Sequence, residues 1–168
     1  MFVLWMTGLP CSGKTTIARK LQELIPNLAV LDGDELREWL SPKDFSRKGR
    51  NEHNRKVAHL ARLFLKHNVP VVVSLISPFS KNREFARKII GDSMFIETYI
   101  KCSLSLCEKR DDKGLYKKAR LNKIKNFTGV NDDYEIPDNP DLIVNTETDS
   151  LDKIIKQIID YLTSRKML

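Results

Sequence analysis

Short apolar runs and amphipathic stretches alternate along this chain. Apolar runs of about four to eight residues predict buried strands, and they lie at 2–7, 28–31, 69–76, 94–101 and 142–145. Between them, apolar residues recur at the spacing of a helix face, which predicts helices over 14–25, 50–67, 82–90, 104–110 and 151–162. Strands that alternate with helices are typical of βαβ units. We therefore expect an α/β fold with a mainly parallel five-stranded sheet and helices on both faces.

Residues 111–140 break this alternation. The segment is polar and basic, carries Gly114, Gly129, Pro137 and Pro140, and shows little core pattern. A segment of this length in a compact domain is typical of a functional lid. The chain of 168 residues is long enough for one domain with a sizeable core and too short for two of ordinary size. We expect a single domain over 1–168, with a lid at about 111–140.

Composition excludes several classes of protein. Hydrophobic residues make 41% of the chain and charged residues 30%, close to an average globular protein and unlike a disordered one. The longest near-apolar run, 69–76, is far shorter than the roughly 20 residues that span a bilayer, so we expect no membrane partner. The first six residues lack a basic leader, and the three cysteines form no CxxC pair. These features favour reduced thiols in a cytoplasmic protein.

Positive charge is concentrated in one segment. The chain has 29 basic and 22 acidic residues, a net charge of +7. Nine of the basic residues and three of the acidic ones fall within 101–127, so this segment alone carries +6. Such a concentration indicates an anionic partner, although a solvated helix face is the alternative interpretation.

The strongest motif is GLPCSGKT at 8–15, which fits G-x-x-x-x-G-K-[ST]. It follows a predicted strand and opens a predicted helix, the context that a phosphate-binding P-loop requires and an accidental glycine-rich turn would lack. In such a loop the backbone N–H groups and the helix N-terminus surround a phosphate. Lys14 is expected to reach the β- and γ-phosphates and the Thr15 hydroxyl to bind Mg²⁺. The motif predicts a P-loop NTPase fold and a nucleoside triphosphate as substrate.

Polar residues follow the second predicted strand, at Asp32, Asp34 and Arg37. Carboxylates at the carboxyl end of a parallel strand lie at the ligand crevice, where they can hold Mg²⁺ through water or accept a proton from an attacking hydroxyl. If a helix begins here, Asp34 and Arg37 share a face, and Arg37 can bind an acceptor phosphate. The alternative is an aspartate that only caps a helix among surface charges.

Two further groups of residues extend this picture. Phe45 with Arg47 and Arg50 suits base stacking and phosphate binding, although Phe45 alone could equally belong to the core. Ser77 follows the third predicted strand and is expected at the same sheet edge. The three histidines show no metal-ligand spacing on one helix face.

Together the motifs resemble those of adenylylsulfate kinases, P-loop kinases that phosphorylate the 3′-hydroxyl of adenosine 5′-phosphosulfate (APS). The resemblance spans nearly the whole chain. It rests, in order, on residues 8–15, DGD at 32–34 with Arg37, FSRKGR at 45–50, SLISPF at 74–79, CEKRD at 107–111, KGLYKKAR at 113–120, KNFTGV at 125–130 and DNPD at 138–141. As a set these motifs are far more specific than the P-loop alone.

The resemblance implies a role for each matching position. Residues that would bind ATP are Gly8, Leu9, Pro10, Cys11, Ser12, Gly13, Lys14, Thr15, Thr16 and Arg110, with Thr15 on Mg²⁺ and Arg110 packed on the adenine. Residues that would bind APS are Asp32, Asp34, Arg37, Phe45, Arg50, His53, Ile76, Ser77, Lys125 and Phe127. Among these, Arg37 and Arg50 would grip the phosphosulfate, Phe45 and Phe127 would sandwich the adenine, and the backbone at Ile76 and Ser77 would contact the acceptor.

Lys14, Asp34 and Ser77 are the candidate catalytic residues. Asp34 would orient or deprotonate the 3′-hydroxyl. Ser77 occupies a position that is often labelled a phosphoserine intermediate in the family. In-line transfer is favoured instead, because nothing in the sequence activates Ser77 as a nucleophile. The resemblance also implies ATP and APS as small-molecule partners, sulfate activation as the pathway, and a homodimer.

Two positions depart from the family pattern. Cys11 stands where glycine or alanine is common, which narrows the loop and places a thiol near ATP. His53 stands where many members carry an asparagine that contacts the acceptor, and histidine can also donate a hydrogen bond.

Two other functions fit parts of the sequence. The first is a related kinase acting on another acceptor, such as a cytidine diphosphoramidate. The segments Ser77-Pro78 and 126–129 argue against it, because they resemble the APS pocket. The second is a non-catalytic basic module that binds nucleic acid. No base-stacking stripe or groove-reading motif supports this reading, and we expect no nucleic-acid partner.

Overall fold

Five parallel strands form the centre of the molecule in this computed structural model, which describes residues 1–40 and 44–168. The strands are β1 (Val3–Thr7), β2 (Ala29–Asp32), β3 (Val71–Ser74), β4 (Phe95–Lys101) and β5 (Leu142–Asn145). Their order in the sheet is β2-β3-β1-β4-β5, and every neighbouring pair is parallel. The predicted five-stranded parallel sheet is thus confirmed.

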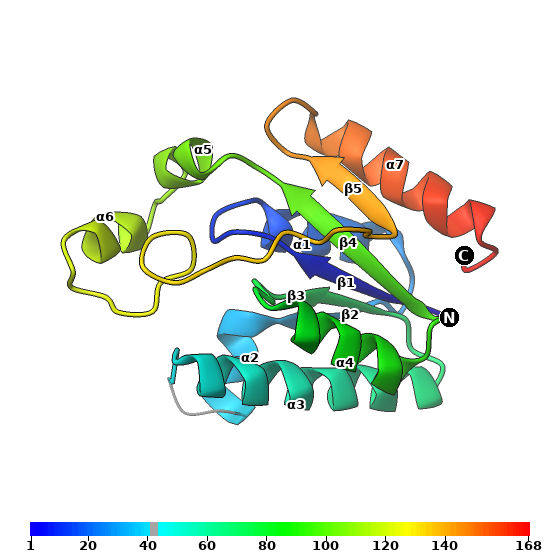
Figure 1. Ribbon diagram of the computed structural model, residues 1–168. Coiled ribbons are helices and arrows are strands. Elements are labelled where there is room, and N and C mark those ends of the chain that lie inside the picture. Colours follow the sequence, from blue (N-terminus) through cyan, green and yellow to red (C-terminus); the bar gives the residue numbers. More distant parts are fainter. Residues whose placement is uncertain (41–43) are drawn as a thin grey trace.

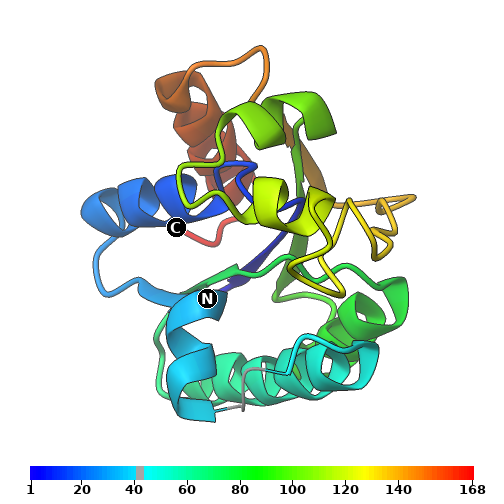
Figure 2. The same cartoon turned by 90° about the vertical axis from the view of Figure 1, so that its left-hand side faces the viewer.

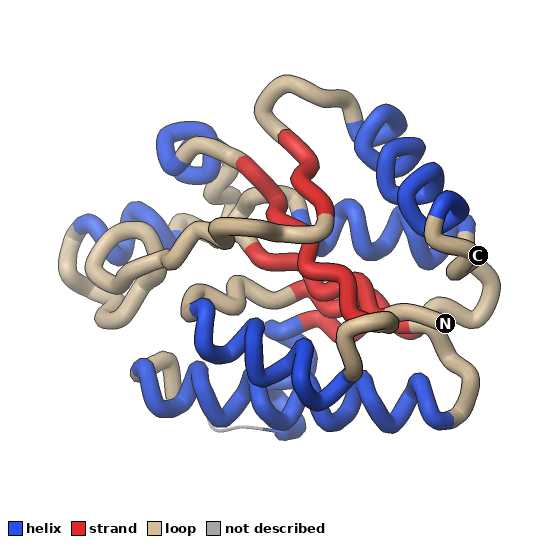
Figure 3. The backbone as a smooth tube through the Cα atoms, turned by 45° about the vertical axis from the view of Figure 1, so that its right-hand side comes forward, coloured by secondary structure: helices blue, strands red, loops and turns tan. Residues whose placement is uncertain are grey.

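Helices cover both faces of this sheet (Figure 1 and Figure 3). The helices are α1 (Lys14–Leu24), α2 (Gly33–Leu40), α3 (Arg47–Lys66), α4 (Ser80–Ile90), α5 (Leu104–Lys109), α6 (Leu115–Arg120) and α7 (Leu151–Ser164). Helices α1 and α7 lie on one face, and α2, α3 and α4 lie on the other. No helix among the described residues is long and apolar enough to cross a membrane.

The central strand β1 shows how the sequence builds two cores. Successive side chains of a strand point to opposite faces, and all five residues of β1 are buried. Leu4 and Met6 pack with α1 and α7, whereas Val3 and Trp5 pack with α2, α3 and α4. A strand that is apolar on both faces is typical of a parallel sheet covered on both sides.

Two element boundaries differ from the prediction. Strand β3 begins at Val71, because the Val69 N–H is already bonded to the Phe64 carbonyl at the end of α3. Helix α3 begins at Arg47 rather than at residue 50, because the Ser46 side chain accepts a hydrogen bond from the Gly49 N–H at 3.1 Å and caps the helix there. Arg47 and Arg50 therefore stand on the first turn of a helix and not in a loop.

The segment 111–140 has more structure than its polar composition predicts. It contains the short helix α6, whose first N–H groups donate to the Asp111 carboxylate: Leu115 at 2.8 Å and Tyr116 at 2.7 Å. Tyr116 is buried in a small apolar cluster with Cys102, Cys107, Ala119 and Phe127. Partly buried residues of the P-loop, of α5 and of the 111–140 segment pack around these five, so this segment contributes to a core although its sequence shows little core pattern.

The carboxyl ends of all five strands point toward α5, α6 and the 111–140 segment (Figure 1). The view in Figure 2 looks onto this end of the molecule, where the P-loop, α5, α6 and the loop after α6 lie together. In parallel α/β sheets, ligands bind at this edge.

Candidate active site

A cleft of about 860 Å³ opens at the carboxyl edge of the sheet. Its walls come from the P-loop, the start of α2 and of α3, the turn after β3, and the 111–140 segment. The sequence-predicted site residues that line it are Pro10, Cys11, Gly13, Lys14, Thr15, Thr16, Asp32, Asp34, Arg37, Phe45, Arg50, His53, Ile76, Ser77, Arg110, Lys125 and Phe127. The structure therefore brings together residues from segments that are far apart in the sequence.

Gly8, Leu9 and Ser12 do not line the cleft: Leu9 packs against the apolar cluster around Tyr116, and Ser12 is fully buried. A side chain at Gly8 would meet the Ile100 carbonyl at 2.7 Å, so only glycine fits this close approach. Gly13 (φ 97°) precedes α1, and Cys11 (φ 60°) also adopts the left-handed conformation. The Cys11 thiol is half-buried at the cleft, and burial raises its pKa.

Lys14 folds back over its own loop. Its Nζ donates to the carbonyls of Gly8 at 2.9 Å and Leu9 at 2.6 Å, and to Ser12 Oγ at 3.2 Å. The side chain is buried, and this loss of hydration lowers the pKa of Lys14 to about 8. A phosphate in the loop would offer the ammonium group better partners than these neutral oxygens.

Oxygen ligands gather beside the P-loop. Thr15 Oγ1 donates to Asp32 Oδ2 at 2.8 Å and lies 3.4 Å from Ser74 Oγ, while Asp32 Oδ1 accepts from the Asp34 N–H at 3.0 Å. Hydroxyl and carboxylate oxygens are the donors that Mg²⁺ prefers, and Mg²⁺ usually takes only one or two protein ligands beside phosphates and water. Within 1–40 and 44–168, no group of three or more His, Cys, Asp or Glu residues is arranged so that it could hold a metal ion. The donor set fits a shared Mg²⁺ rather than a closed metal cage.

Asp34 and Arg37 lie on α2, a helix that the apolar pattern did not predict. The Asp34 side chain is 83% exposed, and one of its oxygens lies 3.5 Å from Lys113 Nζ of the 111–140 segment. The Arg37 guanidinium stacks 4.7 Å from the Phe45 ring centroid and donates to the Asp44 carbonyl at 3.1 Å. Partial burial lowers the pKa of Arg37.

Arg50 joins two walls of the cleft. Its side chain is buried, and Nε donates to the Phe45 carbonyl at 3.0 Å. Its Nη2 donates to the carbonyl of Asn126, 76 positions away and next to Phe127, and Nε lies 3.5 Å from Asp132 Oδ2. The guanidinium therefore holds the loops of both predicted stacking aromatics.

The two aromatics differ in their surroundings. Phe45 is 42% exposed, whereas Phe127 is 9% exposed and packs edge-on against Tyr116 at 4.9 Å between ring centroids. The Tyr116 hydroxyl donates to the Pro10 carbonyl of the P-loop at 3.0 Å. Tyr116 therefore joins the segment that carries Phe127 to the P-loop.

His53 lies on the buried face of α3 and is 1% exposed. Burial lowers the pKa of His53 to about 4, and the nearby charges of Arg37 and Lys56 act in the same direction. The imidazole is therefore neutral at pH 7, with one nitrogen able to donate and the other able to accept a hydrogen bond.

The Ser77 hydroxyl is buried against Trp5 of β1. Ser77 Oγ accepts a hydrogen bond from the buried Trp5 indole at 3.1 Å, and the residue is 1% exposed. An indole N–H that donates to this hydroxyl does not activate it as a nucleophile.

Sequence reasoning missed Thr146. Its carbonyl and hydroxyl accept hydrogen bonds from Arg110 at 2.7 and 3.2 Å, and its hydroxyl donates to the Ser12 carbonyl at 2.9 Å. Thr146 thereby fixes Arg110 against the P-loop. The available signal was its position directly after the last strand, at the same edge as the predicted site.

A family model described as adenylylsulphate kinase matches residues 1–145. The adenylyl-sulfate kinase of Clostridium acetobutylicum is 43% identical over 171 residues, covering 99% of this chain and 85% of the relative. That of Pseudomonas aeruginosa is 41% identical over 169 residues, with 98% and 86% covered.

Among solved structures, the APS kinase of Mycobacterium tuberculosis in complex with AMPPNP and APS superposes with a TM-score of 0.88 at 40% identity. The match covers 96% of this chain and 97% of that chain.

Proposed function

This chain belongs to the adenylylsulphate kinase family, and from this premise we propose that it transfers the γ-phosphoryl group of ATP to the 3′-hydroxyl of APS. The observation that carries the proposal is a single cleft that is lined both by the P-loop and by an acidic, basic and aromatic acceptor set. The product would be 3′-phosphoadenosine 5′-phosphosulfate, the activated form of sulfate.

At the ATP end, the P-loop N–H groups and Lys14 would surround the β- and γ-phosphates. Thr15 and Asp32 would hold Mg²⁺, directly or through water, and the ion would neutralise charge on the transferred group. Arg110 is held by Thr146 beside the loop and lines the cleft, and its guanidinium would pack on the adenine of ATP. Lys14 moves from backbone carbonyls to phosphate oxygens when ATP binds.

At the acceptor end, Phe45 and Phe127 would sandwich the adenine of APS, and Arg37, Arg50 and Lys125 would bind its anionic groups. Asp34 is exposed in the cleft and would accept the proton of the 3′-hydroxyl as the O–P bond forms. No covalent enzyme intermediate is needed, because alignment and electrostatics account for most of the rate of phosphoryl transfer.

We also propose that 1–168 works as one kinase domain in which 111–140 acts as a lid. The Lys113 ammonium is near Asp34, and α6 is joined to the P-loop through Tyr116. Closure of this basic segment over two polyanions would exclude water and add positive charge at the transferred group. A homodimer and a cytoplasmic location remain predictions, and light scattering on the purified protein would measure the oligomeric state.

The experiment is a steady-state assay that couples ADP release to NADH oxidation, with APS, AMP or a cytidine nucleotide as acceptor. We expect turnover with ATP, Mg²⁺ and APS at a kcat/KM about 100-fold or more above that for the other acceptors. Phosphorus NMR of the product should show a new 3′-phosphate monoester. Lys14→Ala serves as the inactive control. ADP release that does not respond to APS, or that is faster with the cytidine nucleotide, would refute the proposal.

A further inference from the structure

The turn after β3 has an unusual backbone conformation at the edge of the cleft. Ser77 has φ 44°, in the left-handed region that a residue with a Cβ rarely adopts. Such a conformation persists only where the surrounding structure holds it in place. Ile76 and Ser77 both line the cleft, so the shape of this turn decides which backbone groups face a bound acceptor.

Both carbonyl groups of the turn are turned inward, toward β1 and α4. The Ile76 carbonyl accepts from Thr7 Oγ1 at 2.8 Å and from the Gly8 N–H at 3.3 Å. The Ser77 carbonyl accepts from Arg83 Nη1 at 2.9 Å and lies 3.1 Å from Thr7 Oγ1. In a trans peptide the N–H points opposite to the preceding carbonyl, so the Ser77 N–H is directed away from β1. It donates to no group in the part of the chain that the structure describes.

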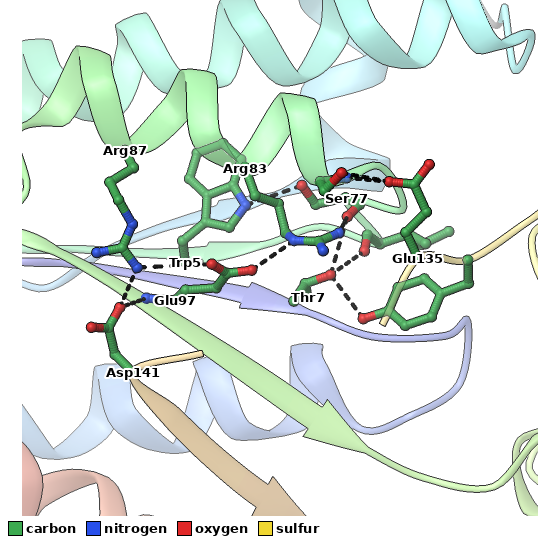
Figure 4. Close-up of polar contacts among 11 residues, drawn as sticks. Trp5, Thr7, Ser77, Arg83, Arg87, Glu97, Glu135 and Asp141 are labelled. Carbon is green, nitrogen blue, oxygen red and sulfur yellow. Dashed lines mark hydrogen bonds and ion pairs between the residues drawn. The ribbon is translucent and has the colours of Figure 1, made fainter. Parts of the chain in front are cut away.

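Arg83 is held in place by a partly buried ionic network (Figure 4). Its side chain is 3% exposed, and Nε donates to Glu97 Oε1 at 2.6 Å. The second Glu97 oxygen lies 3.8 Å from Arg87 Nη2, and Arg87 also donates to Asp141 Oδ2 at 2.5 Å. Asp141 in turn accepts from the Glu97 N–H at 2.8 Å. A buried cation requires such partners, and the network leaves the Nη1 edge of Arg83 aimed at the Ser77 carbonyl.

We propose that Arg83 is a positioning residue for the acceptor nucleotide, which it serves by holding the Ser77 peptide in the left-handed conformation. This inference rests on the proposed function, because it assigns the turn to the APS side of the cleft. Glu97 fixes the direction of Arg83, and Arg83 fixes the Ser77 carbonyl. The Ser77 N–H, which donates to no group among the described residues, then faces the acceptor rather than the P-loop.

Arg83 allows a cleaner test than Thr7. Thr7 precedes Gly8 of the P-loop, and its hydroxyl lies 2.9 Å from the Tyr134 hydroxyl of the 111–140 segment. A change at Thr7 would therefore disturb ATP binding and the lid as well as the turn. Arg83 contacts the turn and Glu97 but has no hydrogen bond or ion pair to the P-loop.

The test compares Arg83→Met with Arg87→Met. Both remove a guanidinium that partners Glu97, but only Arg83 contacts Ser77. We expect Arg83→Met to raise the KM for APS about 10- to 100-fold, since small misplacements of binding groups have effects of this order. Its KM for ATP should change less than about twofold. Arg87→Met should lower the melting temperature but leave both KM values within about twofold of wild type.

A milder variant keeps the test decisive if Arg83→Met does not fold. Glu97→Gln retains a hydrogen-bond acceptor for Arg83 Nε while it removes the charge, so it should raise the KM for APS by a smaller factor and again spare the KM for ATP. Equal changes in both KM values, or an APS effect as large in Arg87→Met, would overturn the positioning role. A wild-type enzyme that does not turn over APS would instead refute the proposed function itself.

Discussion

The buried His53 on α3 should lower the free energy of unfolding of the protein in acid. His53 has a pKa of about 4 in the folded chain, depressed by burial from an unfolded value of 6.5. The test perturbation is His53→Asn, which keeps a hydrogen-bonding group but cannot titrate.

The sign and size of the effect follow from proton linkage. Between pH 6.5 and pH 4 the unfolded chain binds a proton on His53 that the folded chain does not, so the free energy of unfolding falls as pH falls through this window. Above pH 6.5 the His53 imidazole is neutral in both the folded and the unfolded chain, so no stability is lost there. At pH 5 its loss amounts to up to about 2 kcal/mol, and well below pH 4 to about 3 kcal/mol. His53→Asn should not show this loss.

The assay is urea unfolding at pH 7.5 and at pH 5 for the wild type, for His53→Asn and for His59→Asn. His59 lies on the exposed face of the same helix, so it controls for the substitution itself. Carboxylate titrations are common to all three proteins and cancel in the comparison. We expect the wild type and His59→Asn to lose about 2 kcal/mol more than His53→Asn between the two pH values. The same loss in all three proteins would refute the reasoning.

Three further substitutions test the cleft. Lys14→Ala should abolish phosphoryl transfer while thermal unfolding stays cooperative, and retained turnover would contradict the P-loop assignment. Asp34→Asn should lower kcat much more than it raises the KM for APS, and an unchanged kcat would remove Asp34 from the role of base. Phe127→Ala should weaken APS binding more than AMPPNP binding in calorimetry, and equal weakening of both would argue against stacking. Because Phe127 packs on Tyr116, the same substitution should also lower the free energy of unfolding by about 3 kcal/mol.

Much of the fold and site could be predicted because periodicity and strand ends carry positional information. Asp34, Arg37 and Ser77 were placed at one sheet edge by the rule that parallel strands end on the same side, and they line one cleft. The P-loop was recognised from its spacing together with the predicted strand before it and the predicted helix after it. In these cases the chemistry lies within a few residues of a strong apolar run, so sequence neighbours are also spatial neighbours.

The elements that were missed depend on contacts between distant segments. Helix α6 has only six residues, too few for an apolar period, and its start depends on the Asp111 carboxylate. Thr146 belongs to the site only because it forms hydrogen bonds with Arg110 and Ser12, which lie far from it in the sequence. No pattern along the chain indicates which carbonyl a buried guanidinium will contact, so the network around Arg83 was likewise not predicted.

Arg50 illustrates how one residue can hold the pocket and still bind its ligand. Two of its three nitrogens donate to the carbonyls of Phe45 and Asn126, whereas Nη1 has no partner among residues 1–40 and 44–168. Burial lowers the pKa of Arg50, the Asp132 carboxylate opposes that change, and the nearby Arg37 charge adds to it. Two guanidinium groups that repel each other in a partly dehydrated cleft favour an anion between them, because the anion removes the repulsion and supplies the missing acceptor. If Arg37 and Arg50 bind the acceptor as proposed, this pair should favour a phosphosulfate over a neutral nucleoside.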